Sequence, residues 1–196
     1  MEKNYEAYIS SYLDQLGDLT PEEVAFLHPK ITIQAYPKKE FLLKSGDIQR
    51  ELAFILKGLV RRYYINDKGN EISTGFNKED EYVTDYPSFI RQKPTKYFLQ
   101  GLEPSLILSI PYDTIQECYK KFDSFQLYGR MMAEQALSIL SDRMESFLFN
   151  TAEERYVKFM VEQPDLMKRV SLTHLSSLLG IERQSLSRIR KRLRQK

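Results

Sequence analysis

The fold of this chain is decided by residues 170–196, VSLTHLSSLLGIERQSLSRIRKRLRQK. Apolar residues recur three and four apart in two runs, which predicts short helices at 172–179 and 183–193. Between them, Gly180 can adopt the left-handed backbone of a tight turn at little cost. Ser176, four residues earlier, is small enough for two crossing helices to approach closely. Together these features predict a helix-turn-helix.

The second of these helices carries a polar face that suits the recognition of bases. With Leu186, Ile189 and Leu193 turned inward, a rotation of about 100° per residue turns arginine and glutamine side chains outward. Arginine can grip guanine, and glutamine adenine, through two hydrogen bonds in the major groove. The predicted base-reading residues are Arg183, Gln184, Ser187, Arg188 and Lys191. The predicted phosphate-binding residues are Ser171, Thr173, Ser185, Arg190, Arg192 and Arg194.

The charge of the chain is divided unevenly. Residues 168–196 contain nine Lys or Arg and one acid, Glu182, which gives this stretch a net charge of +8. The whole chain is only +2, so residues 1–167 carry a net charge of −6. A basic module on an acidic body is typical of nucleic-acid binding. The alternative is a basic tail that is merely solvated. Such a tail would not need apolar residues at helical spacing together with a glycine at the position of the turn.

The residue types exclude several kinds of site. The 196-residue chain has one cysteine, Cys118, so it has no disulfide framework and too few thiolates for an iron–sulfur cluster. His28 and His174 lie far apart, which argues against a zinc or haem site and against a histidine-based catalytic triad. No signal peptide and no apolar run of membrane-spanning length are present. The sequence predicts a cytoplasmic protein that is not an enzyme, holds no metal or cofactor and does not enter a membrane.

The N-terminal half reads as two short helices followed by a β-rich region. Apolar spacing predicts a helix at 4–16, and Thr20 with Glu23 forms the capping box of a second helix. Turn residues then separate short strand-like segments, with a hairpin signal at 66–70 and a short helix or an irregular loop predicted at 85–90. The predicted strands are 31–36, 40–44, 52–57, 59–66, 71–76, 97–102 and 106–110. They indicate an α+β fold whose N-terminal part is an antiparallel β-roll or jelly-roll barrel.

A long helical zone covers residues 113–149, and its main helix is expected to begin near Asp123. One apolar stripe steps by four and three residues, and a second stripe lies on another face. Two stripes predict two buried surfaces, one against the barrel and one against a partner helix, because four–three spacing suits a two-stranded coiled coil. A single wide core face is the alternative. The predicted dimer-helix residues are Phe125, Met132, Ala133, Leu137, Leu140, Met144 and Phe147.

The predicted domain organisation has three parts. Residues 1–112 form a β-roll sensor domain with its N-terminal helices, and residues 113–150 form the region of the long dimerisation helix. Residues 151–196 form the helix-turn-helix domain. A second capping box, Thr151 with Glu154, starts this last part and places a hinge just before it.

The barrel with its insert, the long helix and the C-terminal helix-turn-helix resemble the CRP/FNR superfamily of bacterial transcription regulators. The most specific match is Ser-Leu-Ser-Arg-Ile-Arg-Lys at 185–191, after Leu-Leu-Gly-Ile at 178–181, and the resemblance covers nearly the whole chain. It implies a homodimer joined through the central helix, with two recognition helices in successive major grooves of a near-palindromic double-stranded DNA site, and contact with RNA polymerase. By position it places Arg183, Gln184 and Arg188 on the bases, and many members carry Glu where this chain has Gln184.

The resemblance does not extend to the nucleotide pocket. Cyclic-AMP-binding members use a Gly-Glu for the ribose and an Arg-Ser or Arg-Thr for the cyclic phosphate, whereas this chain has Thr84-Asp85 and Pro94-Thr95 there. A buried phosphate without its guanidinium loses a charge-assisted bidentate contact, so we expect no cyclic-AMP binding. A small-molecule effector of another kind stays open. The residues of this degenerate candidate pocket are Asp85, Ser88, Phe89 and Thr95.

Three functions compete on these observations. The favoured one is a dimeric, sequence-specific DNA-binding transcription regulator that does not respond to cyclic AMP. The second is a ligand-sensing barrel whose basic tail binds RNA or an acidic protein partner. The third, an enzyme of the cupin type, needs a His-rich metal site that two distant histidines cannot supply. The sequence does not distinguish an activator from a repressor.

Overall fold

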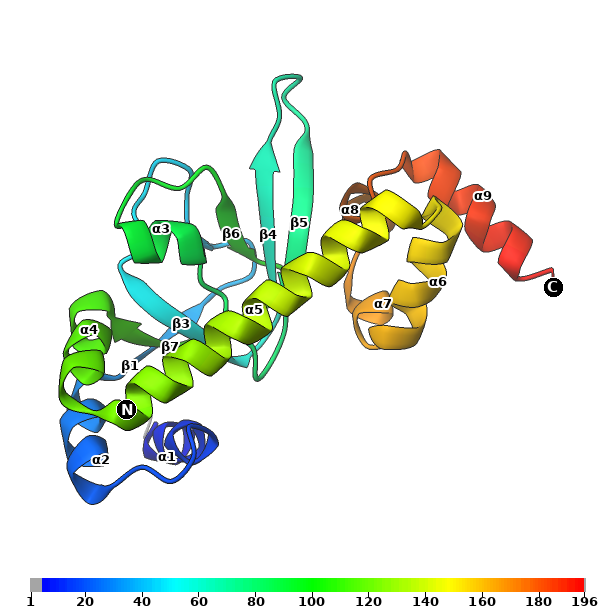
Figure 1. Cartoon of the computed structure of the whole chain (residues 1–196). Coiled ribbons are helices and arrows are strands. Elements are labelled where there is room, and N and C mark those ends of the chain that lie inside the picture. Colours follow the sequence, from blue (N-terminus) through cyan, green and yellow to red (C-terminus); the bar gives the residue numbers. More distant parts are fainter. Residues whose placement is uncertain (1–4, 196) are drawn as a thin grey trace. The chain divides into compact units, whose positions relative to one another are not determined.

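A computed structural model describes residues 5–195 of the chain (Figure 1). Asn4, where the first helix is predicted to begin, and Lys196 lie outside the described residues. The fold is α+β, as predicted, with antiparallel strands between N-terminal and C-terminal helices. The chain divides into two compact units. The first comprises the chain up to Arg62 with Phe76–Met132, and the second comprises Tyr63–Gly75 with the chain from Ala133 onward.

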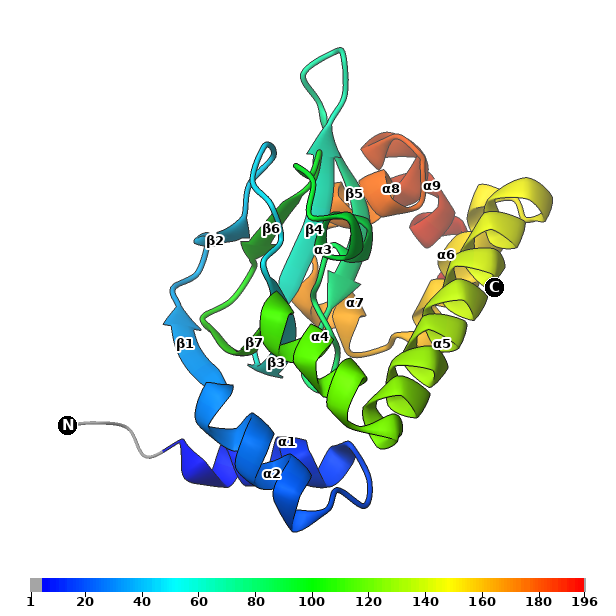
Figure 2. The same ribbon diagram turned by 60° about the vertical axis from the view of Figure 1, so that its left-hand side comes forward.

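The N-terminal helices form where the capping signals predict them. Helix α1 (Glu6–Gln15) lies beside α2 (Pro21–Leu27), and a 3₁₀ turn at His28–Lys30 follows (Figure 2). At the start of α2, the Thr20 hydroxyl oxygen accepts the Glu23 backbone N–H at 3.3 Å. The Glu23 carboxylate in turn accepts the Thr20 N–H at 2.6 Å. This reciprocal capping box satisfies two amides that the helix itself leaves unpaired.

Seven strands form within residues 5–195, and each ends within one residue of its predicted bounds. They are β1 (Thr32–Tyr36), β2 (Phe41–Leu43), β3 (Glu51–Lys57), β4 (Val60–Ile65), β5 (Glu71–Asn77), β6 (Phe98–Gly101) and β7 (Ser105–Pro111). The helix predicted in the insert is α3 (Tyr86–Arg91), which has a proline in its first turn. The agreement is close because Gly, Asn, Asp and Pro mark most of the turns between strands.

The strands form two sheets, ordered β1-β7-β3 and β2-β6-β4-β5. The pairs β1–β7, β3–β7 and β2–β6 are antiparallel, and Leu108 of β7 stands between Ile33 of β1 and Phe54 of β3. Side chains of both sheets meet in one buried cluster, so the sheets pack face to face as in the predicted β-roll. That cluster comprises Leu43, Ala53, Ile55, Val60, Val83, Leu99 and Ile107.

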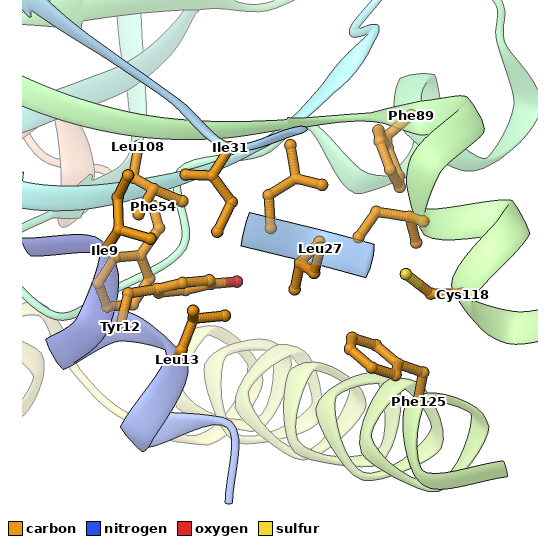
Figure 3. Close-up of a cluster of buried hydrophobic side chains, with 12 residues drawn as sticks. Ile9, Tyr12, Leu13, Leu27, Ile31, Phe54, Phe89, Leu108, Cys118 and Phe125 are labelled. Carbon is orange, nitrogen blue, oxygen red and sulfur yellow. The ribbon is translucent and has the colours of Figure 1, made fainter. Parts of the chain in front are cut away.

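A second buried cluster joins the helices to the β1-β7-β3 sheet (Figure 3). Tyr12 of α1, Leu27 of α2 and Cys118 of α4 (Tyr112–Lys121) all contribute to it. Phe125 is also a member, and it is only 5% exposed at the start of α5 (Asp123–Phe149). The assignment of Phe125 to the dimer surface is therefore wrong, because the ring packs into the core of its own chain. The start of α5 at Asp123 is as predicted.

The last four helices form a head that belongs to the second unit. They are α6 (Ala152–Glu162), α7 (Leu166–Arg169), α8 (Leu172–Leu178) and α9 (Arg183–Leu193). Helices α8 and α9 end within one residue of their predicted bounds, and α6 begins directly after the predicted capping box of Thr151 with Glu154. Helix α7 was not predicted, because a single turn is too short for apolar periodicity to reveal it. Leu166, which is 4% exposed, anchors this turn.

Strand β5 lies at the edge of its sheet and is hydrogen-bonded to the head within the second unit. The Ser177 hydroxyl of α8 accepts the backbone N–H of Ser73 at 2.7 Å and donates to the carbonyl of Glu71 at 3.2 Å. From α5, the Arg143 guanidinium donates to the carbonyl of Thr74. Three bonds therefore connect the backbone of β5 to α5 and α8.

Candidate DNA-binding surface

The turn between α8 and α9 has the geometry that the glycine predicts. Gly180 has φ +69°, and its N–H donates to the Ser177 carbonyl at 3.2 Å, while the Ile181 N–H donates to the Ser176 carbonyl at 3.0 Å. These two bonds form a Schellman motif, which ends α8 and turns the chain sharply. Ser176 is 4% exposed, as expected for a small residue between two packed helices.

Helix α9 is anchored by the predicted apolar stripe. Leu186 is 0% and Ile189 is 8% exposed, and Leu175 of α8 is 1% exposed. Burying a leucine or isoleucine side chain contributes about 1.5–3 kcal/mol, so this stripe holds α9 firmly on α8. Glu182 stands at the N-cap of α9 without a side-chain capping bond, in agreement with its weak capping tendency.

The opposite face of α9 presents the predicted base-reading residues to solvent. All five are exposed, namely Arg183, Gln184, Ser187, Arg188 and Lys191. Two local bonds order this face, from the Ser187 hydroxyl to the Arg183 carbonyl at 3.0 Å and from Arg188 to the Ser185 hydroxyl at 3.3 Å. The side chains thus lie on one exposed helix face, as major-groove reading requires.

The predicted phosphate-binding residues surround this face but differ in what they already bind. Ser171, Thr173 and Arg194 are exposed, while Ser185 and Arg190 are half-buried. Ser171 accepts the N–H of His174 at 3.2 Å as the N-cap of α8, which leaves its hydroxyl hydrogen to donate. Arg192 is paired with Glu153 of α6, so it offers less free charge than the sequence predicts.

A shallow groove runs along the C-terminal half of α9. Its walls come from Ser187, Arg190, Lys191, Arg194 and Gln195. Three cations and two neutral polar side chains line it, which is the lining that a phosphate backbone attracts. The groove extends the base-reading face without a break, since Ser187 and Lys191 belong to both.

The four candidate pocket residues of the β-roll are buried, and most of their polar side-chain atoms have hydrogen-bond partners within the chain. Asp85, Ser88, Phe89 and Thr95 are all 6% exposed or less. The Thr95 hydroxyl donates to Asp85 Oδ2 at 2.5 Å, and the Ser88 hydroxyl donates to the Lys93 carbonyl at 2.6 Å. Among the described residues, Asp85 Oδ1 has no hydrogen-bond partner.

Phe89 belongs to the helix-facing core cluster and stacks edge-on against Tyr112 with ring centroids 5.2 Å apart. It is therefore a core side chain, which corrects its assignment as a wall of an effector pocket. For Asp85, Ser88 and Thr95 the role stays a prediction.

Helix α5 exposes an apolar stripe along its second half. Leu137, Leu140 and Met144 are 68%, 58% and 60% exposed. Steps of three and four residues place them on one helix face together with the half-buried Ala133. Contiguous exposed apolar residues mark interaction surfaces, so this stripe is the part of the chain that best fits a partner helix.

Two other predicted dimer residues have different surroundings. Met132 is half-buried and, seven residues after Phe125, shares the face that packs on its own chain. Phe147 is 43% exposed, and its ring lies against the turn at Gly180. For both residues the dimer role stays a prediction.

A contact between the long helix and the head was not foreseen from the sequence. The guanidinium of Arg155 in α6 donates to the carbonyls of Asn150 and Leu179 and lies over the ring of Phe147. Nothing in the sequence around Arg155 distinguishes it from the solvated charges of a helix, because its partners are brought to it by the turns on both sides.

Between residues 5 and 195, the structure gives little support for metal binding, for a membrane-spanning helix or for thiol chemistry. No three His, Cys, Asp or Glu side chains come close enough there to hold a metal ion. No helix in the same range is long and apolar enough to cross a membrane. Cys118 is buried, and burial raises the pKa of its thiol to about 11, so the thiol is protonated near neutral pH and has little of the reactive thiolate.

The fold and the exposed basic helix define the class of protein: a β-roll of the cyclic-nucleotide-binding type, a long helix and a helix-turn-helix head. Residues 33–122 match the family described as Cyclic nucleotide-binding domain. The fumarate and nitrate reduction regulatory protein of Yersinia pestis is 24% identical over 164 residues, which cover 78% of this chain and 64% of that protein. The chain thus spans less than two thirds of this relative. The β-roll is thus similar to the cyclic nucleotide-binding domain, and most of the chain is similar to this regulatory protein.

Solved structures support the same fold. FixK2 from Bradyrhizobium japonicum superposes with a TM-score of 0.74 at 15% identity, covering 84% of this chain and 85% of FixK2. A putative CRP/FNR-family transcriptional regulator from Eubacterium rectale also gives 0.74 at 15% identity, covering 94% and 88%. At 15% identity, these two matches show the fold alone.

Proposed function

We propose that the protein is a dimeric, sequence-specific DNA-binding transcription regulator whose α9 helix reads the major groove. The observation that carries this proposal is the exposed face of α9, on which Arg183, Gln184 and Arg188 stand opposite the buried Leu186 and Ile189. The cationic groove beside that face supplies the nonspecific attraction to phosphate that DNA-binding proteins use.

The remaining parts have roles that follow from this proposal. The residues up to 112 serve as the sensor domain, 113–150 as the dimerisation region and 151–196 as the reading domain. The protein works in the cytoplasm, binds a near-palindromic operator as a homodimer and contacts RNA polymerase. It needs no cofactor, and any effector of the β-roll is a small molecule other than a cyclic nucleotide.

Selection of bound sequences from random duplex DNA tests the proposal. A dimer with two recognition helices enriches a two-fold symmetric motif with half-sites about one helical turn, ~34 Å, apart. A failure to enrich any duplex motif, together with binding to RNA or to an acidic protein, would favour the ligand-sensing alternative instead.

Replacing Arg188 by Ala is expected to weaken operator binding by ~1–3 kcal/mol and to relax the base preference at one position of each half-site. Arg188 is exposed on the reading face and makes one bond within the head, to Ser185, so its loss should leave folding intact. Binding curves against operators varied at each position measure both effects.

Arg194→Ala is the matched control, since Arg194 lines the groove rather than the centre of the reading face. It should weaken all sequences alike and lower the salt slope by about one. Equal behaviour of the two variants would contradict the separate roles of base and phosphate contacts.

Cyclic AMP is expected to leave the thermal unfolding temperature unchanged. Pro94 stands where cyclic-AMP-binding members carry arginine, and the hydroxyl of the next residue, Thr95, already donates to Asp85. A ligand at 100 times its dissociation constant would add ~2.7 kcal/mol of stability. Thermal unfolding followed by circular dichroism over a cyclic-AMP titration checks this, and a concentration-dependent rise would contradict it.

A further inference from the structure

Arg155 occupies the junction at which α5 ends, α6 begins and α8 ends. Its Nη1 donates to the carbonyl of Asn150 at 2.6 Å. Its Nε and Nη2 donate to the carbonyl of Leu179 at 3.2 and 3.0 Å. Asn150 directly follows α5, and Leu179 is the C-cap of α8. One planar side chain therefore bonds the ends of two helices.

The ring of Phe147 completes this junction. The Arg155 guanidinium carbon lies 4.8 Å from the ring centroid, within the range of a cation–π contact. A Cβ placed on Gly180 would lie 3.1 Å from Phe147 Cε1, so the ring reaches the α8–α9 turn at contact distance. The last turns of α5 thus pack directly on the turn that aims the recognition helix.

The chemistry of the junction suits arginine in particular. The Schellman bonds occupy the carbonyls of Ser176 and Ser177, whereas the Leu179 carbonyl lies beyond them at the negative end of α8. A guanidinium is a rigid fork that can bond two carbonyls and stack on a ring at once, whereas a lysine ammonium is a flexible point charge.

We propose that Arg155 is a positioning residue, which fixes the direction of the recognition helix relative to the dimerisation helix and thereby sets the half-site spacing of the operator. Helix α9 follows α8 through the buried contacts of Leu186 and Ile189, so whatever holds the end of α8 also directs α9. The inference rests on the proposed function, because a spacing exists only if two heads bind one duplex.

The test uses the full chain and a set of duplexes with identical half-sites. The spacer has the selected length or is one or two base pairs longer or shorter, and one duplex carries a single half-site. In Arg155→Gln and Arg155→Lys, affinity for the selected spacing should fall by roughly tenfold, because a loosened head reduces the effective concentration of the second half-site. The preference over the altered spacings should shrink, while affinity for the single half-site stays the same.

Lys158→Gln is the matched control. Lys158 is also a cation of α6, is 44% exposed and pairs with Glu162 of the same helix at 3.8 Å. This variant loses the same charge and should keep the spacing preference of the original protein. Arg155→Lys retains the charge, so it separates the geometry of the fork from electrostatic attraction to DNA.

Two results would overturn the inference. One is an unchanged spacing preference in both Arg155 variants, and the other is an equal loss of affinity for every duplex, including the single half-site, which would indicate a purely structural role. Failure of the original protein to select a symmetric site would overturn the proposed function instead, so the two failures are distinguishable.

Discussion

Replacing Leu137 by Glu is expected to convert the proposed dimer into monomers and to remove most operator binding. Leu137 is the most exposed member of the stripe that includes Leu140 and Met144. A dimer would bury it twice, at ~1.5–3 kcal/mol per side chain, so its loss should raise the dimer dissociation constant by ~100- to 10,000-fold. Glutamates facing each other across the seam would add repulsion and desolvation.

The effect on DNA follows from the loss of the second head. Two linked heads bind ~100- to 10,000-fold more tightly than one when both half-sites are reachable. Sedimentation equilibrium gives the mass, and binding to duplexes with one or two half-sites gives the affinity. The monomeric variant should bind the two duplexes almost equally per half-site.

Ile139→Glu is the control for this prediction. Ile139 is 59% exposed, close to the value for Leu140, but it lies one residue away and therefore about 100° around the helix. Its replacement should leave the dimer intact. If Ile139→Glu dissociates the protein and Leu137→Glu does not, the dimer face of α5 has been assigned to the wrong side.

The second large effect concerns stability, because Gly58→Ala should destabilise the β-roll by at least ~3 kcal/mol. Gly58 joins β3 to β4 with φ +109°, a conformation that residues with a side chain rarely adopt. A Cβ there would lie 2.7 Å from the Cα of Ser105, which is backbone that cannot swing away. For a chain of about this length, such a loss lowers the unfolding temperature by ~6–12 °C.

Gly69→Ala separates the two causes. Gly69 has φ +78°, but nothing lies within 4 Å of the position of its Cβ. Only the backbone strain remains, and it costs ~1–2 kcal/mol. Thermal unfolding of both variants measures the difference, and equal shifts would mean that contact with Ser105 does not limit the choice of residue at Gly58.

The sequence predicts local structure well because local signals determine it. Seven strands and the three main head helices are bounded by residues that favour turns and caps, such as Gly180 and the box of Thr151 with Glu154. The exposed face of α9 was predictable for a similar reason, since the buried positions Leu186 and Ile189 fix where the other side chains of the helix point.

Contacts between distant segments explain what the sequence could not reveal. The position of Phe125 in the apolar pattern of the long helix does not distinguish it from a residue of the dimer surface. Its cluster with side chains of α1, α2 and α4 shows that its own chain covers it. Arg155 and Ser177 carry no periodic signal at all, because their partners are backbone groups supplied by other elements. The pairing of Thr95 with Asp85 likewise depends on a loop path that no local pattern encodes.

The Ser177 hydroxyl also has a consequence for solubility. The edge strand of a sheet offers backbone groups that can pair with a strand of another molecule, which is a common route to aggregation. By bonding to both the Ser73 N–H and the Glu71 carbonyl, one hydroxyl takes the place of a neighbouring strand on β5. The helix-turn-helix head thereby occupies two of the backbone groups through which β5 could pair with a strand of another copy.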